Sequence, residues 1–380
     1  MPPRSLLAVL IVNYNTTALT RSCVASLHAQ TIRSPDGTNG APQIVVFDNA
    51  SRTEERQALL GIAAQVIYND DNRGYGAALN QAVACTDSEY VLFSNADTWY
   101  CPGALQALID EARSLPRWGA IGPRIWWDRE RNFLLPPSDP VTLSSRCCEA
   151  ILGKRSEGQR WLQRSWRKRA LDYWRTQRPL SQALLSGACL LTKREVLAAC
   201  GGFDERFRLY YEDTDWCRRV RQKGYRLYCV PTADVVHLHN QSARQERETA
   251  QLMGAESETR YFQKYYGAWI GTRLDRLVTP WRMNEDEKWQ SRAHVDCGTC
   301  QQPPHFSLSM PLQGEYLWQL SPFPSCVPAI ARFVTKEEEL RLPQHMWNLL
   351  SNGAFYAGLF SLPTIQPVQY WRWQKTSSPE

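Results

Sequence analysis

Apolar runs alternate with amphipathic stretches along roughly the first 125 residues. The run from Leu7 to Val12 is continuously apolar, which is typical of a strand buried on both faces of a parallel sheet. Shorter apolar runs follow at 44–47, 66–68 and 90–93, and the stretches between them carry apolar residues at helical spacing. This alternation predicts an α/β fold with a mostly parallel central sheet and helices on both faces.

Short polar motifs directly follow several of the predicted strands. They are Asn13-Tyr14-Asn15, Asp48-Asn49-Ala50-Ser51 and Asn95-Ala96-Asp97. Ligands of open parallel sheets bind at the carboxyl ends of the strands. We therefore expect these motifs to line one binding site.

An acidic cluster flanked by aromatic residues follows the helix stop signal Gly201-Gly202. It reads Tyr210-Tyr211-Glu212-Asp213-Thr214-Asp215-Trp216. Aromatic side chains exclude water and crowded carboxylates shift each other's pKa, which together suit a general base. The alternative is structural, because acids in a first helical turn interact favourably with the helix dipole and cap free N–H groups. The motifs upstream favour the catalytic interpretation.

An ordered set of motifs carries a family resemblance. The set is Val12-Asn13-Tyr14-Asn15, Phe47-Asp48-Asn49-Ala50-Ser51, Asn72-Arg73-Gly74-Tyr75-Gly76, Asn95-Ala96-Asp97, Ser186-Gly187-Ala188 and Tyr211-Glu212-Asp213-Thr214-Asp215. Over roughly residues 6 to 270, the chain resembles the family 2 glycosyltransferases of GT-A fold, the rhamnosyltransferase-like branch in particular. Each motif is weak by itself, whereas the ordered set is specific.

The resemblance implies a nucleotide-sugar site. Asp48 matches the aspartate that binds the base or ribose in the family, although an aspartate here can also cap the following helix. Gly74 and Gly76 let the backbone approach a ligand or make a turn, and Arg73 and Asn80 are equally compatible with a surface role. The donor-binding residues that we expect are Asn13, Tyr14, Asn15, Asp48, Asn49, Asn72, Arg73, Gly74, Gly76, Asn80, Asn95 and Asp97.

The resemblance also implies a metal site for Mg²⁺ or Mn²⁺. Asn95-Ala96-Asp97 stands where the family carries its D-x-D motif, so that the cation would bridge Asp97 to the donor diphosphate. Asn95 replaces the first acid and is a weaker, neutral ligand. His237 matches the strand-end histidine that often ligates the metal in the family, and His239 is the alternative. The structural interpretations are a turn-capping Asp97 and an ordinary buried histidine.

The resemblance predicts an inverting glycosyltransferase. Asp213 would remove the proton from an acceptor hydroxyl, and Glu212 would orient the acceptor or tune Asp213. The acceptor-binding residues that we expect are Gly187, Tyr210, Tyr211, Asp215 and Trp216. The implied donor is dTDP-rhamnose, or another dTDP- or UDP-sugar. The implied acceptor is a cell-surface polysaccharide or a lipid-linked saccharide.

Two other classes of function are weighed against this one. A sugar- or nucleotide-binding protein that has lost catalysis would be consistent with Asn95 in the metal motif. The joint presence of Asp97, Glu212, Asp213 and His237 argues against it. A dehydrogenase on a similar sheet is disfavoured, because the 72–76 segment lacks G-x-G-x-x-G and does not follow the first strand.

The positive charge of the chain is concentrated in one segment. The whole chain carries a net charge of +6, while residues 146–178 hold ten lysines and arginines against three acids, a local +7. Trp161, Trp166 and Trp174 lie in the same segment. Basic residues interleaved with tryptophan suit an anionic membrane surface, or else a solvated helix with its tryptophans buried. Nucleic acid is the least favoured partner and is not expected.

The domain prediction follows from these patterns. We expect a GT-A domain at 1–275 with a basic, Trp-rich insertion at 126–180. A linker at 276–304 would precede a small all-β, sandwich-like module at 305–380. No apolar run approaches the roughly 20 residues of a membrane helix, and Leu7 to Val12 lacks the flanks of a signal peptide. We therefore expect a cytoplasmic protein, peripheral at the inner face of the cell membrane.

Cysteine usage fits that compartment. The chain has 12 cysteines, many of them inside apolar stretches, and in a reducing compartment most remain thiols. Cys297 and Cys300 form one C-x-x-C pair, which is half of a structural zinc site. Only irregularly spaced candidates could complete it, so zinc and free thiols both stay open.

Overall fold

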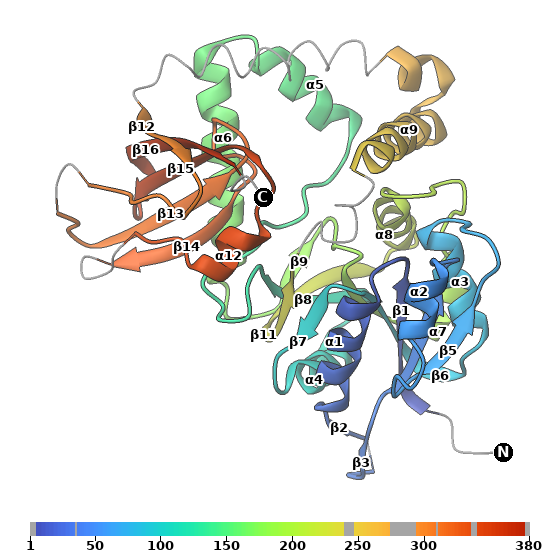
Figure 1. The fold of residues 1–380 in the computed structure, drawn as a ribbon. Helices are drawn as coiled ribbons and strands as arrows, with labels where there is room; N and C mark the ends of the chain where they lie inside the picture. Colours follow the sequence, from blue (N-terminus) through green and yellow to red (C-terminus); the bar gives the residue numbers. More distant parts are fainter. Residues whose placement is uncertain are drawn as a thin grey trace. The chain divides into compact units, whose positions relative to one another are not determined.

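The structure, a computed structural model, describes residues 5–34, 36–238, 247–273, 294–308, 311–335 and 340–376. The chain divides into two compact units, each assembled from more than one segment (Figure 1). The first unit comprises Met1–Arg129, Ser138–Val141 and Thr176–Thr272. The second comprises Glu130–Pro137, Thr142–Arg175 and Arg273–Glu380.

A nine-stranded sheet forms the centre of the first unit among the described residues, in the order β5-β4-β1-β6-β10-β8-β11-β7, with β9 paired to β11. The pairings make β5, β4, β1, β6, β8 and β11 run in one direction, and β10, β7 and β9 run against them. The strands are β1 (Ser5–Asn13), β4 (Gln43–Asp48), β5 (Gln65–Tyr68), β6 (Ser88–Asn95), β7 (Thr98–Tyr100), β8 (Trp118–Trp126), β9 (Leu180–Gln182), β10 (Cys189–Lys193) and β11 (Arg226–His237). A separate hairpin joins β2 (Ile32–Arg33) to β3 (Asn39–Gly40).

Helices cover both faces of this sheet. The helices of this unit are α1 (Thr17–His28), α2 (Thr53–Ala58), α3 (Tyr75–Ala84), α4 (Ala104–Ser114), α7 (Arg194–Cys200), α8 (Glu212–Gln222) and α9 (Arg247–Tyr266). Alternate residues of β1 belong to opposite cores, because side chains of a strand point alternately to its two faces. Leu7, Val9 and Ile11 pack with residues of α1 and α4, whereas Leu10 packs with α3 and with Trp216 of α8. The predicted mostly parallel sheet with helices on both faces is confirmed.

The second unit contains a five-stranded sheet in the order β12-β16-β15-β13-β14, in which only β12 and β16 pair in parallel. Its elements are α5 (Leu143–Leu152), α6 (Ser156–Arg175), β12 (His294–Cys300), β13 (Glu315–Ser321), β14 (Ile330–Thr335), α12 (Gln344–Leu349), β15 (Gly353–Ser361) and β16 (Gln366–Lys375). The rings of Trp318, Trp371 and Trp373 all pack edge-on against Phe306. This aromatic cluster forms the core of the all-β module that the sequence predicted.

The long helix α6 packs against this sheet, alongside the strands drawn in orange and red (Figure 1). The contact centres on Arg167, which is only 4% exposed. Its Nε donates to Gln319 Oε1 at 2.8 Å, its Nη2 donates to the Ser325 carbonyl at 2.7 Å, and its guanidinium lies over the Phe360 ring. One arginine of the basic segment is therefore an internal anchor.

The units divide the chain differently from the predicted domains. Residues 142–175, expected as an insertion within the 1–275 domain, belong to the same unit as the C-terminal strands. The expected 276–304 linker contains the strand β12, which pairs with β16. Both differences have the same cause. Helix α6 packs against the C-terminal sheet and β12 pairs with β16, and in both cases the partner is distant in the sequence. No helix among the described residues is both long and apolar enough to span a membrane.

Candidate active site

A cavity of about 540 Å³ opens in the first unit, beside the carboxyl ends of β1 and β6 and the start of α8. The predicted site residues that line it are Tyr14, Asn15, Asn49, Asn72, Gly74, Asn95, Asp97, Gly187, Tyr210, Glu212, Asp213 and His237. The predicted site residues outside its lining are Asn13, Asp48, Arg73, Gly76, Asn80, Tyr211, Asp215 and Trp216. Motifs from distant parts of the sequence thus meet in one place.

The acidic cluster enters the cavity through a turn of unusual backbone conformation. Tyr210 and Tyr211 both have positive φ, 62° and 67°, which for non-glycine residues costs on the order of 1–3 kcal/mol each. Helix α8 begins immediately afterwards, at Glu212. The turn places Glu212 and Asp213 in the first helical turn, with both side chains at the cavity wall.

Asp213 is held by backbone donors. The Gly187 amide donates to Oδ2 at 2.8 Å, and the Thr214 amide and hydroxyl donate to Oδ1 at 2.6 and 3.2 Å. Burial raises the pKa of Asp213, and these hydrogen bonds lower it and so oppose the shift. A Cβ on residue 187 would lie 3.1 Å from the Asp213 side chain, so Gly187 permits this close approach.

Glu212 has the opposite environment. It is 6% exposed, and its Oε2 has no hydrogen-bond partner among the described residues. Burial raises the pKa of Glu212 to about 8, and the neighbouring Asp213 carboxylate adds to the shift. At neutral pH the Glu212 carboxyl is therefore protonated and can donate a hydrogen bond into the cavity.

The raised pKa of Glu212 predicts a pH-dependent gain in stability for Glu212→Gln. The folded chain holds the Glu212 proton up to about pH 8, whereas a glutamate in the unfolded chain loses it near pH 4.5. The stability that this proton contributes is therefore complete below pH 4.5 and is lost as the pH rises to about 8. The uncharged variant avoids this loss, so its unfolding temperature should exceed that of the wild type by at least about 2 °C at pH 8. Thermal unfolding at pH 5 and 8 measures the difference, and an equal difference at both pH values would contradict the assignment.

Asp97 and His237 meet at the cavity wall. Both are nearly buried, and His237 Nε2 lies 3.1 Å from Asp97 Oδ1. Asn95 Nδ2 lies 3.3 Å from the same ring nitrogen, and the Tyr75 hydroxyl donates to Asn95 Oδ1 at 2.7 Å. Both contacts are to one ring nitrogen, which accepts from Asn95 only when it does not donate to Asp97, and the Asn95 oxygen is already used by Tyr75.

The residues at this wall fit a divalent cation. Asp97 offers a carboxylate oxygen and His237 a ring nitrogen, and the two atoms are close enough to share one ion with a ligand in the cavity. His237, from β11, thus lies beside Asp97, the one acid of the Asn95-Ala96-Asp97 motif. His239, the alternative ligand, lies outside the described residues.

The segment before α3 forms another wall. Gly74 has φ +98°, and a Cβ there would lie 2.6 Å from the Arg208 carbonyl oxygen, so only glycine fits. Asn72 Oδ1 accepts from the Gly74 amide at 3.0 Å and from Asn49 Nδ2 at 2.9 Å. Arg73 instead points outward, where it pairs with the exposed Asp71.

Asp48 does not line the cavity. It is fully buried, and its oxygens accept from Asn13 Nδ2 at 2.8 Å and from Arg56 Nε at 2.9 Å. The network ties the ends of β1 and β4 to α2. Asn80 likewise is engaged internally, since it bonds both backbone groups of Phe203.

Three residues expected to bind the acceptor face away from the cavity. Asp215 is fully buried, where it accepts from Arg219, Lys264 and the Tyr265 hydroxyl. Trp216 is also fully buried, so it presents no ring face to a sugar. The remaining residue, Tyr211, packs against Tyr261. Helical geometry is the reason. The rotation of α8 turns the side chains of residues 215 and 216 away from the cavity, toward the core and α9.

Sequence reasoning missed several residues of the wall. Tyr75 and Arg208 line the cavity, and α9 contributes Thr249, Ala250 and Met253. Tyr75 belongs to the Asn72-Arg73-Gly74-Tyr75-Gly76 motif, so the sequence carried a signal for it. The α9 residues carry no local pattern that distinguishes them from any amphipathic helix.

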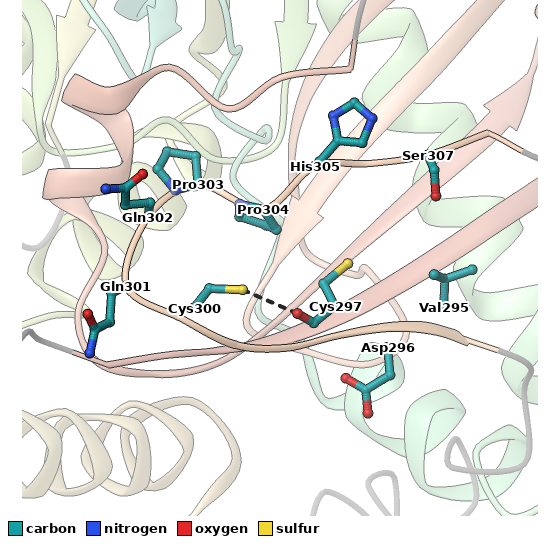
Figure 2. Close-up of a pocket in the computed structure, with 10 residues that line it drawn as sticks. All are labelled: Val295, Asp296, Cys297, Cys300, Gln301, Gln302, Pro303, Pro304, His305 and Ser307. Carbon is teal, nitrogen blue, oxygen red and sulfur yellow. Dashed lines mark hydrogen bonds between the residues drawn. The ribbon is translucent and has the colours of Figure 1, made fainter.

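A second, open hollow lies in the other unit, beside the C-x-x-C pair (Figure 2). Cys300 Sγ lies 3.4 Å from the Cys297 carbonyl oxygen, and burial raises the pKa of both thiols. Figure 2 shows the His305 imidazole pointing away from them. Among the described residues, no group of three histidine, cysteine or carboxylate ligands whose atoms all lie within 4.8 Å of one another includes these two cysteines.

Residues 8–198 match the family model of glycosyl transferase family 2. The chain belongs to this family. This family 2 glycosyltransferase is 30% identical over 244 residues to an N-acetylglucosaminyl-diphospho-decaprenol L-rhamnosyltransferase of Mycobacterium tuberculosis, with 60% of this chain and 76% of the relative covered.

Two further matches have lower sequence identity. The O-antigen biosynthesis protein RfbC of Myxococcus xanthus is 27% identical over 270 residues, which cover 69% of this glycosyltransferase and 19% of RfbC. Among solved structures, a mannosyltransferase from Pyrobaculum calidifontis in complex with GDP-Man and Mn²⁺ is 16% identical. It has a TM-score of 0.46 and covers 77% of each chain.

Proposed function

We propose that this glycosyltransferase moves a sugar from a nucleoside diphosphate to an acceptor hydroxyl with inversion at the anomeric carbon. One observation carries the proposal: the Asp213 carboxylate and the Asp97–His237 pair line the same cavity. A base and a site for a cation that neutralises the leaving diphosphate, both on one cavity, are two elements that suit such a displacement.

Each group has a separate role in the proposed reaction. Asp213 takes the proton of the acceptor hydroxyl, and the oxygen attacks the anomeric carbon opposite the nucleoside diphosphate, which leaves with the bonding electrons. The Gly187 and Thr214 amides hold the Asp213 carboxylate in one orientation for this transfer. Glu212, neutral by its raised pKa, donates a hydrogen bond to a sugar hydroxyl.

Asp97 and His237 are the proposed ligands of Mg²⁺ or Mn²⁺. When bound, the cation supplies charge neutralisation to the leaving diphosphate. The Tyr75 hydroxyl holds the Asn95 side chain beside the Asp97–His237 pair.

The proposed donor is dTDP-rhamnose, and the proposed acceptor is a saccharide carried on a lipid diphosphate for cell-envelope polysaccharide synthesis. Support comes from the name of the mycobacterial relative, an L-rhamnosyltransferase acting on N-acetylglucosaminyl-diphospho-decaprenol. The family resemblance supports a dTDP-sugar.

A donor-hydrolysis assay tests this proposal. The full chain is incubated with Mn²⁺ and a panel of dTDP-, UDP- and GDP-sugars, and release of the nucleoside diphosphate is measured with and without saccharide acceptors. We expect turnover with dTDP-rhamnose above the rest of the panel. Binding of a nucleotide sugar without any release or transfer would instead favour the catalytically weakened binding protein.

We also propose peripheral association with the inner face of the cell membrane through α6. Trp161 is 61% exposed, and Arg160, Arg164 and Lys168 are exposed on the same helix at intervals of four residues. This spacing places the three cations on one face. Charge complementarity with an anionic leaflet supports the proposal. Arg167 has no part in it, because it is buried against the sheet.

The triple substitution of Arg160, Arg164 and Lys168 by Gln should weaken binding to anionic vesicles by about 10-fold or more, since each cation contributes on the order of 1 kcal/mol. Co-sedimentation with phosphatidylglycerol vesicles measures it, and raised salt should weaken wild-type binding similarly. The matched control removes the same charge from the first unit by replacing Arg33, Lys223 and Arg226, all exposed. Equal vesicle binding by wild type and the α6 variant would refute the proposal that this face of α6 binds the membrane.

A further inference from the structure

Arg208 occupies a distinctive place in the cavity. Among the described residues that line it, Arg208 is the only lysine or arginine. The other ionisable groups of the lining include the carboxylic acids Asp97, Glu212 and Asp213. An anionic ligand that binds in the cavity therefore meets several carboxylic acids and one permanently charged arginine.

The backbone of Arg208 is clamped to the segment before α3. Its carbonyl accepts from the Tyr75 amide at 3.0 Å, and Gly74 packs directly against it. Replacement of Gly74 by any other residue would force the two segments apart. The backbone of residue 208 is thus held against the Gly74-Tyr75 segment.

The side chain of Arg208 is also held. Its Nη2 donates to the Asn72 carbonyl at 3.1 Å, which uses one of the five N–H donors of a guanidinium. The side chain is otherwise exposed to solvent. An arginine oriented in this way presents its remaining donors in a planar fork, the geometry that matches phosphate oxygens.

We propose that Arg208 binds a diphosphate group in the cavity and, in the reaction, stabilises the charge on the leaving nucleoside diphosphate. The inference rests on the proposed function for the identity of the ligand. Arg208 and the Asp97–His237 pair line the same cavity, and the contribution of Arg208 does not depend on a bound cation, because the guanidinium carries its own charge.

Calorimetry with the full chain tests the inference. dTDP and UDP are titrated in Mn²⁺ and in EDTA, inorganic pyrophosphate is titrated in EDTA, and thymidine serves as a ligand without phosphate. Arg208→Gln should weaken dTDP binding by about 10-fold or more in both buffers, because a hydrogen bond to a charged group is lost. Arg208→Lys should be intermediate, since it keeps the charge but not the fork. Thymidine binding should be unchanged.

Arg206→Gln is the matched control. Arg206 lies two residues away, is exposed, pairs with Asp204 and does not line the cavity. Its substitution should leave dTDP affinity within about twofold of wild type. Thermal unfolding of each variant shows whether a change in affinity comes from destabilisation by loss of the Asn72 contact rather than from loss of a contact with the ligand. Arg208→Lys then decides, because partial recovery of affinity requires the charge.

The diphosphate could belong to the donor or to a lipid-linked acceptor, and a second arm separates them. KM is measured for a short-chain prenyl diphosphate saccharide and for an octyl glycoside of the same sugar. A rise in KM for the diphosphate acceptor alone, with unchanged dTDP affinity, assigns Arg208 to the acceptor. Equal affinities and KM values for wild type and Arg208→Gln in all arms overturn the inference. Absence of any nucleoside diphosphate binding by wild type refutes the proposed donor class as well.

Discussion

Asp213→Asn is expected to lower turnover by about 10² or more while the fold and the donor affinity are kept. The amide has the shape of the carboxylate but cannot accept the proton of the acceptor hydroxyl. Because the Gly187 and Thr214 amides both need an acceptor, the variant leaves one N–H without a partner, at roughly 1 kcal/mol of stability. The loss of turnover should greatly exceed what this modest destabilisation can explain.

Single-turnover kinetics and donor calorimetry on the same preparation separate the two effects. Asp110→Asn is a suitable control, because Asp110 is an exposed aspartate on α4 whose partner is Arg113. Wild-type turnover in Asp213→Asn would remove Asp213 from the role of base.

Asp97→Ala is expected to remove the metal-dependent part of donor affinity entirely, so that the variant binds dTDP in Mn²⁺ no better than wild type does in EDTA. The carboxylate is the one anionic ligand opposite His237 in the described cavity wall. Calorimetry with and without EDTA measures the effect.

His237→Ala should reproduce much of this loss, because the two side chains share the proposed ion. Asp97 is nearly buried, so Asp97→Asn is measured beside the alanine variant to keep the packing. Equal affinity of the wild type with and without EDTA would count against any metal at this wall.

The sheet was predictable from the sequence, because a buried strand leaves a strong local pattern. The continuous run from Leu7 to Val12 became β1, and the polar motifs after β1 and β6 met in the cavity as expected. Strand ends in a parallel sheet converge by geometry alone, so motif position was enough to place Tyr14 and Asp97.

The direction of individual side chains was not predictable in the same way. Trp216 stands within an aromatic-acidic cluster, but one helical turn carries it into the core beside Phe93 and Phe203. Asp48 ends a strand as the motif requires, yet Arg56 and Asn13 occupy its oxygens. A sequence motif fixes which residues are near a site, whereas packing decides which of them face it.

Long-range packing was the other missing element. The composition of the basic segment, residues 146–178, does not reveal that Arg167 pairs with Gln319 of the C-terminal sheet. Arg208 and Met253 reach the cavity from segments without recognisable binding motifs. Their roles depend on tertiary contacts that no local pattern encodes.

The pairing of α6 with the C-terminal sheet also determines the order of events during synthesis. Arg167 and Gln319 are 152 residues apart, so at 5–20 residues per second the ribosome delivers the helix roughly 8–30 s before the strand that anchors it. During that interval the Arg167 side chain, which is buried in the finished protein, lacks its partners Gln319, Ser325 and Phe360. A chain truncated near residue 275 leaves the Arg167 side chain permanently without these partners. The catalytic unit is therefore obtained as a clean fragment only by removing α6 together with the strands, not by cutting between them.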